Sequence, residues 1–458
     1  MAQALAAHHG ANATAIAAEL AMLLDAARDF AGSATQFLTA ASQASAIFGF
    51  REALALAERG LSAVRNMPAG PGRSQLELGL QMVKGNALRS TTGWATPALE
   101  QTFARARELS AELGDPPPVF PVLWAITLFH LIRGNLLECR ERADQLMDKA
   151  AASGAPSLLL GAHHMAGVSR EFIGEMEESS RLLERARELH VPGEHASYIQ
   201  MYGTDLGILA RAMSSRPLWA LGFPDRALER ARETVAVASA LGEPPTLAFA
   251  LMVLTGIHTY RGEGDEALST GDRNIALCRE HGLPQEAEWS RSFQGGALIA
   301  IGRTQEGIDL LKESLAVQIK LDTRLAFPMF LALLAEGYCR AGLIDEGRRA
   351  VDDGFAWAAR TGEGGYVAEL HRTRGELTRA AGDAVSAEES FRAAIAYARG
   401  QTGRMFELRA ATGLARLMAA QARRDDARAL LEPIVAWFSE GFDTADLRAA
   451  RGALAALE

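Results

Sequence analysis

Small and apolar residues return at fixed places along this chain, between turns that carry glycine. Five glycines follow one another at an unbroken spacing of 40 residues: Gly222, Gly262, Gly302, Gly342 and Gly382. A second series stands halfway between them and consists of Gly242, Gly282 and Gly362, with Asp322 at the one vacant place. A fixed period of this length indicates one supersecondary unit copied in tandem.

The 40-residue series continues upstream with Gly134 and Gly174, and we call the seven glycines Gly134, Gly174, Gly222, Gly262, Gly302, Gly342 and Gly382 the mid-repeat glycines. Each unit also carries a small residue at two fixed places around its mid-repeat glycine. Seven residues before that glycine stand Thr127, Gly167, Ser215, Thr255, Gly295, Ala335 and Gly375. Five residues after it stand Cys139, Ser179, Ala227, Ala267, Gly307, Gly347 and Ala387. An antiparallel helix pair needs small side chains where its two backbones approach most closely. This pattern resembles that of the tetratricopeptide (TPR) repeat.

The pattern predicts an all-α fold, a TPR-like solenoid that occupies residues 1–458 as a single domain. We expect a capping helix at 12–30, about ten helix pairs over 34–439 and a second capping helix at 443–457. The expected pairs are 34–48/50–66, 74–90/97–113, 119–133/136–152, 156–173/176–190, 198–221/224–241, 245–261/264–281, 284–301/304–321, 325–341/344–361, 365–381/384–400 and 404–420/424–439. The step from Gly174 to Gly222 is 48 residues, eight more than the period, and we place this insertion within 191–205. Resemblance to TPR proteins implies a right-handed superhelix with the first helix of each pair on the concave face.

Composition narrows the class of partner. The 458 residues carry a formal net charge of -9, which disfavours nucleic acid as a general partner. No segment approaches 18 consecutive apolar residues, and no basic stretch precedes an apolar run at the N-terminus, so we expect neither membrane insertion nor secretion but a cytoplasmic protein. The three cysteines share no metal-ligand spacing and are expected to be free thiols.

Several stretches resemble a more specific group. They are LALLAEGYCRAGLIDEG (331–347), YVAELHRTRGEL (366–377) and WFSEGFDTADLRAARGAL (437–454), and the likeness extends upstream through 96–125 and 202–228. These stretches resemble the C-terminal TPR part of bacterial signalling ATPases, including adenylate-cyclase-like proteins and MalT-type regulators. No GxxxxGK[ST], cyclase segment or DNA-binding module is present in the sequence. The resemblance therefore implies a part that receives signals or holds partners, and it does not carry over the ATPase or cyclase activity.

The positions that face the groove in TPR proteins supply the candidate binding residues. Methionine and aromatic side chains dominate the middle of this predicted groove, and acids and bases alternate in its C-terminal third. With Asp205 from the insertion, the candidates are Trp124, His164, Glu171, Asp205, Met213, Arg216, Met252, Tyr260, Trp289, Phe293, Met329, Glu336, Arg340, Glu369 and Arg372. Methionine beside aromatics makes an adaptable apolar surface, suited to a helix or to a small apolar ligand. The alternative is that these side chains form the core between repeats.

These observations favour a non-catalytic scaffold or receptor that binds a protein or peptide partner in its concave groove. A small-molecule-sensing regulatory domain is the first alternative. The second is an enzyme with a pocket in which His164, Asp205 and Glu171 or Arg211 perform acid–base chemistry. No catalytic residue, metal or cofactor is predicted. For a metal, the adjacent histidines His163 and His164 diverge by roughly 100° on a helix and cannot chelate one ion together.

Overall fold

The computed structural model describes residues 15–92, 96–114 and 119–457. Within these ranges every regular element is a helix and no strand occurs, which confirms the predicted all-α fold. The chain divides into two compact units. The first comprises residues 1–132 together with 191–205, and the second comprises 133–190 together with 206–458. No helix among the described residues is both long and apolar enough to cross a membrane.

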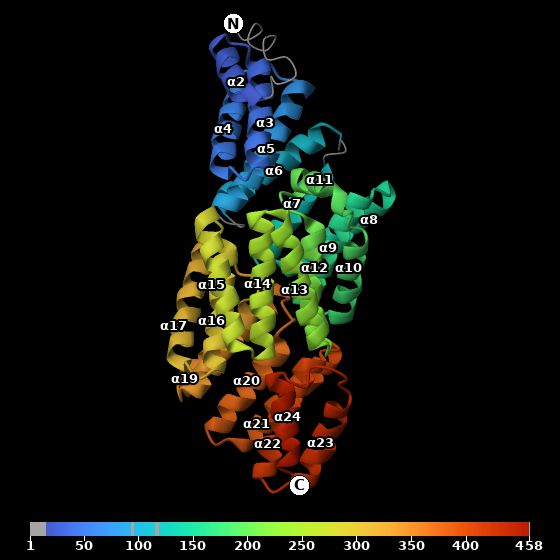
Figure 1. Ribbon diagram of the computed structural model, residues 1–458, viewed down its shortest axis with the longest axis vertical. Helices are drawn as coiled ribbons and strands as arrows, with labels where there is room; N and C mark the ends of the chain where they lie inside the picture. Colours follow the sequence, from blue (N-terminus) through green and yellow to red (C-terminus); the bar gives the residue numbers. More distant parts are fainter. Residues whose placement is uncertain (1–14, 93–95, 115–118, 458) are drawn as a thin grey trace. The chain divides into compact units, whose positions relative to one another are not determined.

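The first unit is built from helices of two segments of the chain, of which the first runs from blue to teal in Figure 1 and the second, with α11, is green. They are α2 (Ala17–Ala26), α3 (Phe30–Ala46), α4 (Phe50–Arg65), α5 (Pro71–Thr92), α6 (Pro97–Glu112), α7 (Val119–Ile132) and, from the second segment, the short 3-10 helix η2 (Pro192–Glu194) and α11 (His195–Tyr202). The carboxylate of Asp29 accepts a hydrogen bond from the Gly32 amide at 3.0 Å and caps α3. Residues 12–14 of the capping helix predicted at 12–30 lie outside the described residues. Over the rest of that range the structure has α2 and, from Phe30, the start of α3.

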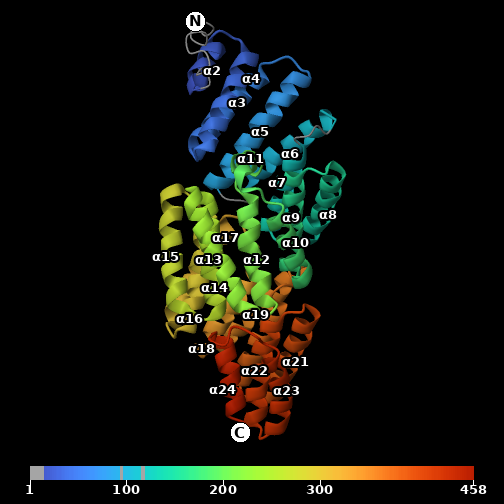
Figure 2. The same cartoon turned by 45° about the vertical axis from the view of Figure 1, so that its right-hand side comes forward.

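The second unit contains the regular repeats. Its helices are α8 (Leu136–Ser153), α9 (Pro156–Ile173), α10 (Met176–Glu188), α12 (Leu206–Ala220), α13 (Pro224–Leu241), α14 (Pro244–Arg261), α15 (Gly264–His281), α16 (Pro284–Ala300), α17 (Thr304–Lys320), α18 (Phe327–Arg340), α19 (Ile344–Thr361), α20 (Val367–Ala380), α21 (Ala384–Gly400), α22 (Arg404–Ala420), α23 (Arg424–Ala436) and α24 (Ala445–Ala455). Figure 2 shows α21 to α24 packed side by side at the C-terminal end of this unit.

The repeated glycines end the helices. Gly242 and Gly262 lie in the left-handed region with φ of 71° and 75°, which is the usual conformation just past a helix C-terminus and one that glycine adopts without steric cost. Asp322, at the vacant place in the series, keeps the same turn with φ of 53°. Aspartate is one of the few other residues that enter this region readily, so the period of the turns survives the substitution.

One predicted helix is wrong. The expected helix over 198–221 is divided at residues 203–205 into α11 and α12, which belong to different units. Gly203 causes the break, because it takes φ of 73° and its amide donates to the Ile199 carbonyl at 2.7 Å, which closes α11. The segment 191–205, where the eight-residue insertion was expected, forms η2 and α11.

The first helices of the pairs form the interior of the second unit. From α12 through α14, α16, α18, α20 and α22, each contacts the first helix of the next pair, and α12 also contacts α22. Residues far apart in sequence meet in the same way. The Gly365 amide donates to the Phe172 carbonyl at 2.8 Å, and the Gly441 amide donates to the Asp225 carboxylate at 2.7 Å. The superhelix of this unit therefore closes on itself.

Candidate functional site

Nearly all predicted groove residues are buried. The two exceptions are Glu336, which is half-buried, and Arg340, which is exposed. Two candidates belong to the first unit: Trp124 packs edge-on against Tyr202 with ring centroids 5.1 Å apart, and Asp205 lies 2.7 Å from Nδ1 of His195. The other candidates belong to the second unit.

The apolar middle of the predicted groove is a packed interior. Trp219 stacks on Tyr260 with ring centroids 4.7 Å apart, and Phe293 packs edge-on against Phe330 at 5.5 Å. The ring centroid of Trp289 lies 6.4 Å from that of Phe293 and 5.6 Å from that of Phe330. The candidate methionines, Met213, Met252 and Met329, are buried with them. At these positions the side chains fill the space that an open groove would occupy.

A buried ion pair crosses this interior. The Arg216 Nε donates to the Glu171 carboxylate at 2.5 Å, and an Arg216 Nη donates to the Tyr366 hydroxyl at 3.3 Å. That hydroxyl shares a second hydrogen bond with Tyr260 at 2.7 Å. Burial raises the pKa of Glu171, against the opposing effect of Arg216. Because each buried charge has a partner, this network can persist inside the apolar core.

The residues considered for acid–base chemistry each have a different environment. Burial lowers the pKa of His164 to about 4. Glu171 is paired with Arg216, and Arg211 donates to Glu233 at 2.6 Å. Asp205 pairs with His195 in the first unit. The carboxylates and Arg211 are thus engaged with other partners, rather than with one another. Among the described residues, no group of three or more His, Cys, Asp or Glu side chains is arranged to hold a metal ion.

A continuous row of ion pairs runs across the inner face near the C-terminal end of the second unit. We call it the six-charge chain, and its members are, in spatial order, Arg340, Glu336, Arg372, Glu369, Arg409 and Asp446. They come from α18, α20, α22 and α24. Three positive and three negative charges alternate along this chain, so it is neutral as a whole.

The distances within the six-charge chain are those of direct ion pairs. Arg372 lies 2.8 Å from Glu336 and 3.0 Å from Glu369. Arg409 lies 2.7 Å from Glu369 and 3.1 Å from Asp446. Burial opposes the ionisation of Glu336, but the neighbouring guanidinium groups outweigh it and lower the pKa of Glu336 to about 2. The structure thus brings together four predicted residues, Glu336, Arg340, Glu369 and Arg372, and adds Arg409 and Asp446.

A small cavity separates the six-charge chain from the aromatic interior. Its volume is about 30 Å³, which is the space of at most a few water molecules. Its walls include Trp219, Thr259, Tyr260, Met329, Ala332, Leu333, Glu336, Tyr366, Glu369, Arg372 and Arg409. The cavity is too small to hold a metabolite.

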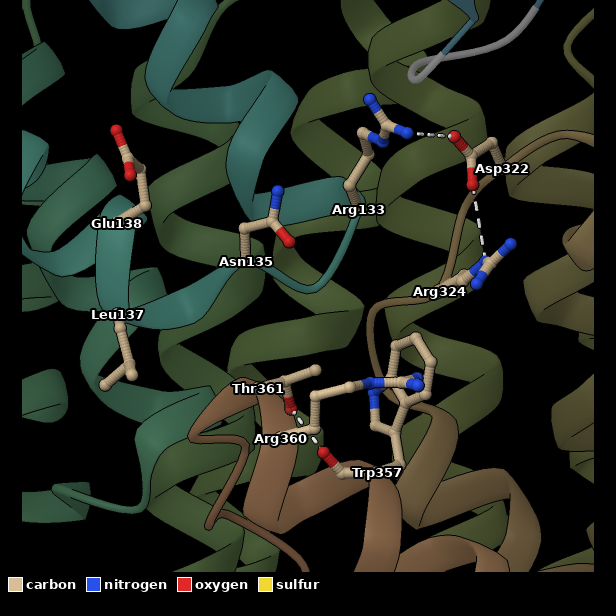
Figure 3. Close-up of a pocket in the computed structure, with 9 residues that line it drawn as sticks. All are labelled: Arg133, Asn135, Leu137, Glu138, Asp322, Arg324, Trp357, Arg360 and Thr361. Atoms are coloured by element: carbon tan, nitrogen blue, oxygen red, sulfur yellow. Dashed lines mark hydrogen bonds and ion pairs between the residues drawn. The ribbon is translucent and has the colours of Figure 1, made fainter.

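A larger pocket opens elsewhere on the second unit (Figure 3). Its volume is about 560 Å³, and it lies between the start of α8, the loop that joins α17 to α18, and the last turn of α19. The residues that line it are Arg133, Asn135, Leu137, Glu138, Asp322, Arg324, Trp357, Arg360 and Thr361. We call it the arginine pocket.

Charge in the arginine pocket is concentrated on one side. Asp322 pairs with Arg133 at 2.8 Å and with Arg324 at 3.3 Å. The guanidinium of Arg360 lies 4.2 Å above the ring of Trp357, in the geometry of a cation–π contact. One carboxylate therefore serves two guanidinium groups, and the third rests on an aromatic face.

Comparison with known proteins identifies the architecture. No model of a known protein family matches the chain. An uncharacterized protein of Rhizobium meliloti (strain 1021) is 22% identical over 382 residues, and the match covers 80% of this chain. The chain spans 36% of the length of that relative.

Two solved structures share the arrangement of helices. A Rap protein complexed with competence and sporulation factor aligns with 93% of this chain and 100% of its own, at a TM-score of 0.51 and 12% identity. The Cut9–Hcn1 hetero-tetramer of APC/C aligns with 97% of this chain and 83% of its own, at a TM-score of 0.53 and 11% identity. The fold is TPR-like. At such low identities these likenesses show the fold alone.

The arginine pocket was missed by sequence reasoning, although one signal pointed to it. Within the TPR-like series of glycines, Asp322 is the one residue that departs from the rule, and its carboxylate pairs with two arginines of this pocket. Arg133 and Trp357 lie at the ends of helices in other repeats, and no local pattern distinguishes them. Their proximity to Asp322 depends on how far the superhelix turns from one repeat to the next.

Proposed function

We propose that the chain is a non-catalytic TPR-like scaffold that binds a protein or peptide partner on the inner face of its second unit. The observation that carries this proposal is a change in exposure along the inner helices. Trp219, Tyr260 and Phe293 are buried, whereas the side chains of Arg340 on α18 and Arg379 on α20 are 45% and 49% exposed. The C-terminal part of the inner face is therefore the part that a partner can reach.

The exposed part of the inner face presents pairs of opposite charge. Arg340 lies 2.8 Å from Glu336, and Arg379 lies 2.8 Å from Glu376 on the next inner helix. In each pair the arginine is exposed and the glutamate is half-buried. Fully exposed pairs contribute only about 0–1 kcal/mol to stability, and an arginine that reaches solvent in this way is held only weakly. A partner with its own charges can therefore exchange with them at small cost. The preformed helices keep the ordering cost on the receptor side low.

The similar Rap protein structure supports a binding role for the fold, because that protein was solved in complex with competence and sporulation factor. For this chain, the class of partner proposed is an extended peptide or protein segment with alternating charges. Such a segment matches the alternation of acid and base along α18 and α20.

Selection from a display library of random 15-residue peptides tests this proposal. Peptides enriched on the wild-type chain should bind it in solution, and the Arg340→Glu/Arg379→Glu variant should bind them at least about tenfold more weakly, because reversal places like charges opposite the peptide. Fluorescence polarisation with labelled peptides measures the affinity.

The matched control is Arg303→Glu. Arg303 pairs with Glu306, and its side chain is 51% exposed, close to the 49% of Arg379, but it stands at the N-cap of the outer helix α17. The control should leave affinity unchanged. Equal loss in the control and the double variant, or no loss in either folded variant, would contradict binding on the inner face.

A further inference from the structure

The arginine pocket has the size of a small-molecule site. Pockets that enclose drug-sized ligands range from about 300 to 1,000 Å³, and this one measures about 560 Å³. Its walls come from residues 133–138, 322–324 and 357–361, three segments that only the closure of the second unit brings together. A bound molecule would touch all three.

Positive charge exceeds negative charge among the side chains at the centre of the pocket. Arg133, Arg324 and Arg360 line the pocket together with Asp322, whose carboxylate pairs with Arg133 and with Arg324. Arg360 has no carboxylate partner among the described residues and is held by its contact with Trp357. In Figure 3 its guanidinium lies over the ring of Trp357, beside Thr361.

The acidic residue Glu138 does not cancel this excess. It stands at the edge of the pocket opposite Arg324 in Figure 3, and its carboxylate accepts hydrogen bonds from Arg142 on the same helix, the shortest at 2.6 Å. Arg142 is not among the residues that line the pocket. The charge of Glu138 is therefore balanced from outside.

The N-terminus of α8 adds a second attraction for anions. Asn135 occupies the N-cap position, and its side chain makes no capping hydrogen bond to the helix, so the amide can turn toward the pocket as it does in Figure 3. Leu137 and Glu138 of the first turn line the pocket as well. The first amides of a helix have no partner within the helix and carry a partial positive charge, which favours an anion close to them.

We propose that the arginine pocket binds a small organic phosphate. A phosphate monoester carries about -1.5 to -2 charge at pH 7, and its three acceptor oxygens can pair with more than one guanidinium group at once. Guanidinium groups bind phosphate oxygens through two parallel hydrogen bonds, and both Arg324 and Arg360 line the pocket. The volume left beside the phosphate accommodates the organic part, which contacts the exposed side chain of Leu137.

This site goes beyond partner binding on the inner face and does not depend on it. A ligand held by residues 133–138, 322–324 and 357–361 would tie an early repeat of the second unit to a later one and stabilise the closed form. The structure therefore assigns to this pocket the sensing of a phosphorylated metabolite.

Isothermal titration calorimetry with the full chain tests the proposal. The probes are glucose 6-phosphate, AMP and phosphoserine, compared with inorganic phosphate and succinate. At least one ester should bind with a Kd below about 1 mM, more tightly than inorganic phosphate or succinate. Arg324→Gln and Arg360→Gln should each weaken that ester by about 10-fold to 100-fold, because each removes a charge-assisted pair of hydrogen bonds.

Arg279→Gln is the matched control. Arg279 is an exposed arginine in the last turn of α15, the same place that Arg360 has in α19, but it lies outside the pocket. It should leave the affinity unchanged. Circular dichroism and the unfolding midpoint establish that all three variants are folded.

Three outcomes would overturn the proposal. The absence of any binding would show that the pocket takes no anion of this class. Equal affinity for inorganic phosphate and the best ester, or for succinate and that ester, would mean that the organic phosphate is not recognised. Equal losses in Arg279→Gln and Arg360→Gln would place the binding elsewhere. The peptide experiment above uses other residues, so each proposal can fail alone.

Discussion

The six-charge chain and the arginine pocket lie in the same unit and both contain three arginines, yet they are opposites in charge balance. In the six-charge chain, three carboxylates alternate with the arginines. In the pocket, the carboxylate of Asp322 pairs with Arg133 and Arg324, and Arg360 lies against Trp357 instead. A balanced set of buried ion pairs is complete without a ligand, whereas an excess of one sign in an open pocket attracts one. The balance of charge, rather than the number of charges, distinguishes a row of ion pairs from a pocket that can attract a small anion.

Glu336 and Glu363 show the same difference. The pKa of Glu336, within the six-charge chain, falls to about 2 because arginines outweigh its burial. Glu363 follows directly after α19, and its amide donates to the Thr361 hydroxyl at the floor of the pocket at 3.3 Å. Burial raises the pKa of Glu363 to about 8, since Trp357, Ala326 and Arg216 offset it only in part. Glu363 is therefore mostly protonated at neutral pH.

Removal of one central arginine from the six-charge chain should lower the free energy of unfolding more than any other change considered below. Arg372→Met removes the guanidinium that joins Glu336 to Glu369 and leaves both carboxylates without it. Breaking a buried pair on one side typically costs about 3–5 kcal/mol. We expect the free energy of unfolding in urea, measured by circular dichroism, to fall by about that amount.

The exposed Arg279→Met serves as the control and should change stability by less than about 0.5 kcal/mol. The double variant Glu369→Leu/Arg372→Met should recover part of the loss, because a removed pair costs less than a broken one. A loss below about 1 kcal/mol in Arg372→Met alone would mean that the six-charge chain is solvated, like ordinary surface pairs.

The TPR-like fold was predictable because every repeat packs mainly against its neighbours. A local period of glycines and small residues therefore specifies the helix pairs without knowledge of distant contacts. The prediction failed at Gly203, where a single left-handed residue divides a helix in an otherwise continuous apolar pattern. The prediction also placed Trp289 and Phe293 on the surface of a groove, whereas both are buried, as the alternative interpretation of a core between repeats expects.

The candidate sites were predictable only as far as they are local. Glu336 and Arg340 lie six and two residues before Gly342, and Glu369 and Arg372 lie 13 and 10 residues before Gly382. All four therefore stand on the first helices of adjacent repeats, and their approach follows from the period. Asp446 joins them from the last helix, which no period reaches. The arginine pocket joins residues nearly 190 positions apart, such as Arg133 and Asp322. Small rotations summed over several repeats decide that contact, and sequence does not give them.

The pH dependence of stability should sharpen the contrast between the two glutamates. The pKa of Glu363 is about 8 in the folded chain and near the ordinary 4.5 when unfolded, so between these values the folded state holds a proton that the unfolded state has lost. Its contribution is complete below pH 4.5 and is lost as the pH rises toward 8. The expected slope is about -1.4 kcal/mol per pH unit in that window.

Other groups titrate as well, so the measurement is a difference between wild type and Glu363→Gln. The glutamine stays neutral, and the stability of the variant should decline less between pH 5 and pH 8 than that of the wild type. Glu336→Gln provides the opposite sign, since the contribution of Glu336 is present above pH 4.5 and is lost as the pH falls toward 2. Parallel curves for wild type and Glu363→Gln would show that Glu363 is ionised in the folded chain.

The smallest effect is expected at Asp322, the residue at the vacant place in the glycine series. Asp322→Gly relieves the left-handed backbone at φ of 53° but removes two partly exposed ion pairs. Relief of this strain contributes about 1 kcal/mol and each pair about 0–1 kcal/mol, so the change in unfolding free energy should lie within about 0.5 kcal/mol. Asp322→Asn keeps a residue that tolerates this conformation and removes only the charge, so it should be slightly less stable than Asp322→Gly.

Both variants raise the positive charge of the arginine pocket and should bind the organic phosphate more tightly by the same factor. If the glycine variant gained stability while phosphate affinity stayed unchanged in both, Asp322 would be a turn residue alone, and the imbalance that distinguishes the pocket from the six-charge chain would carry no function.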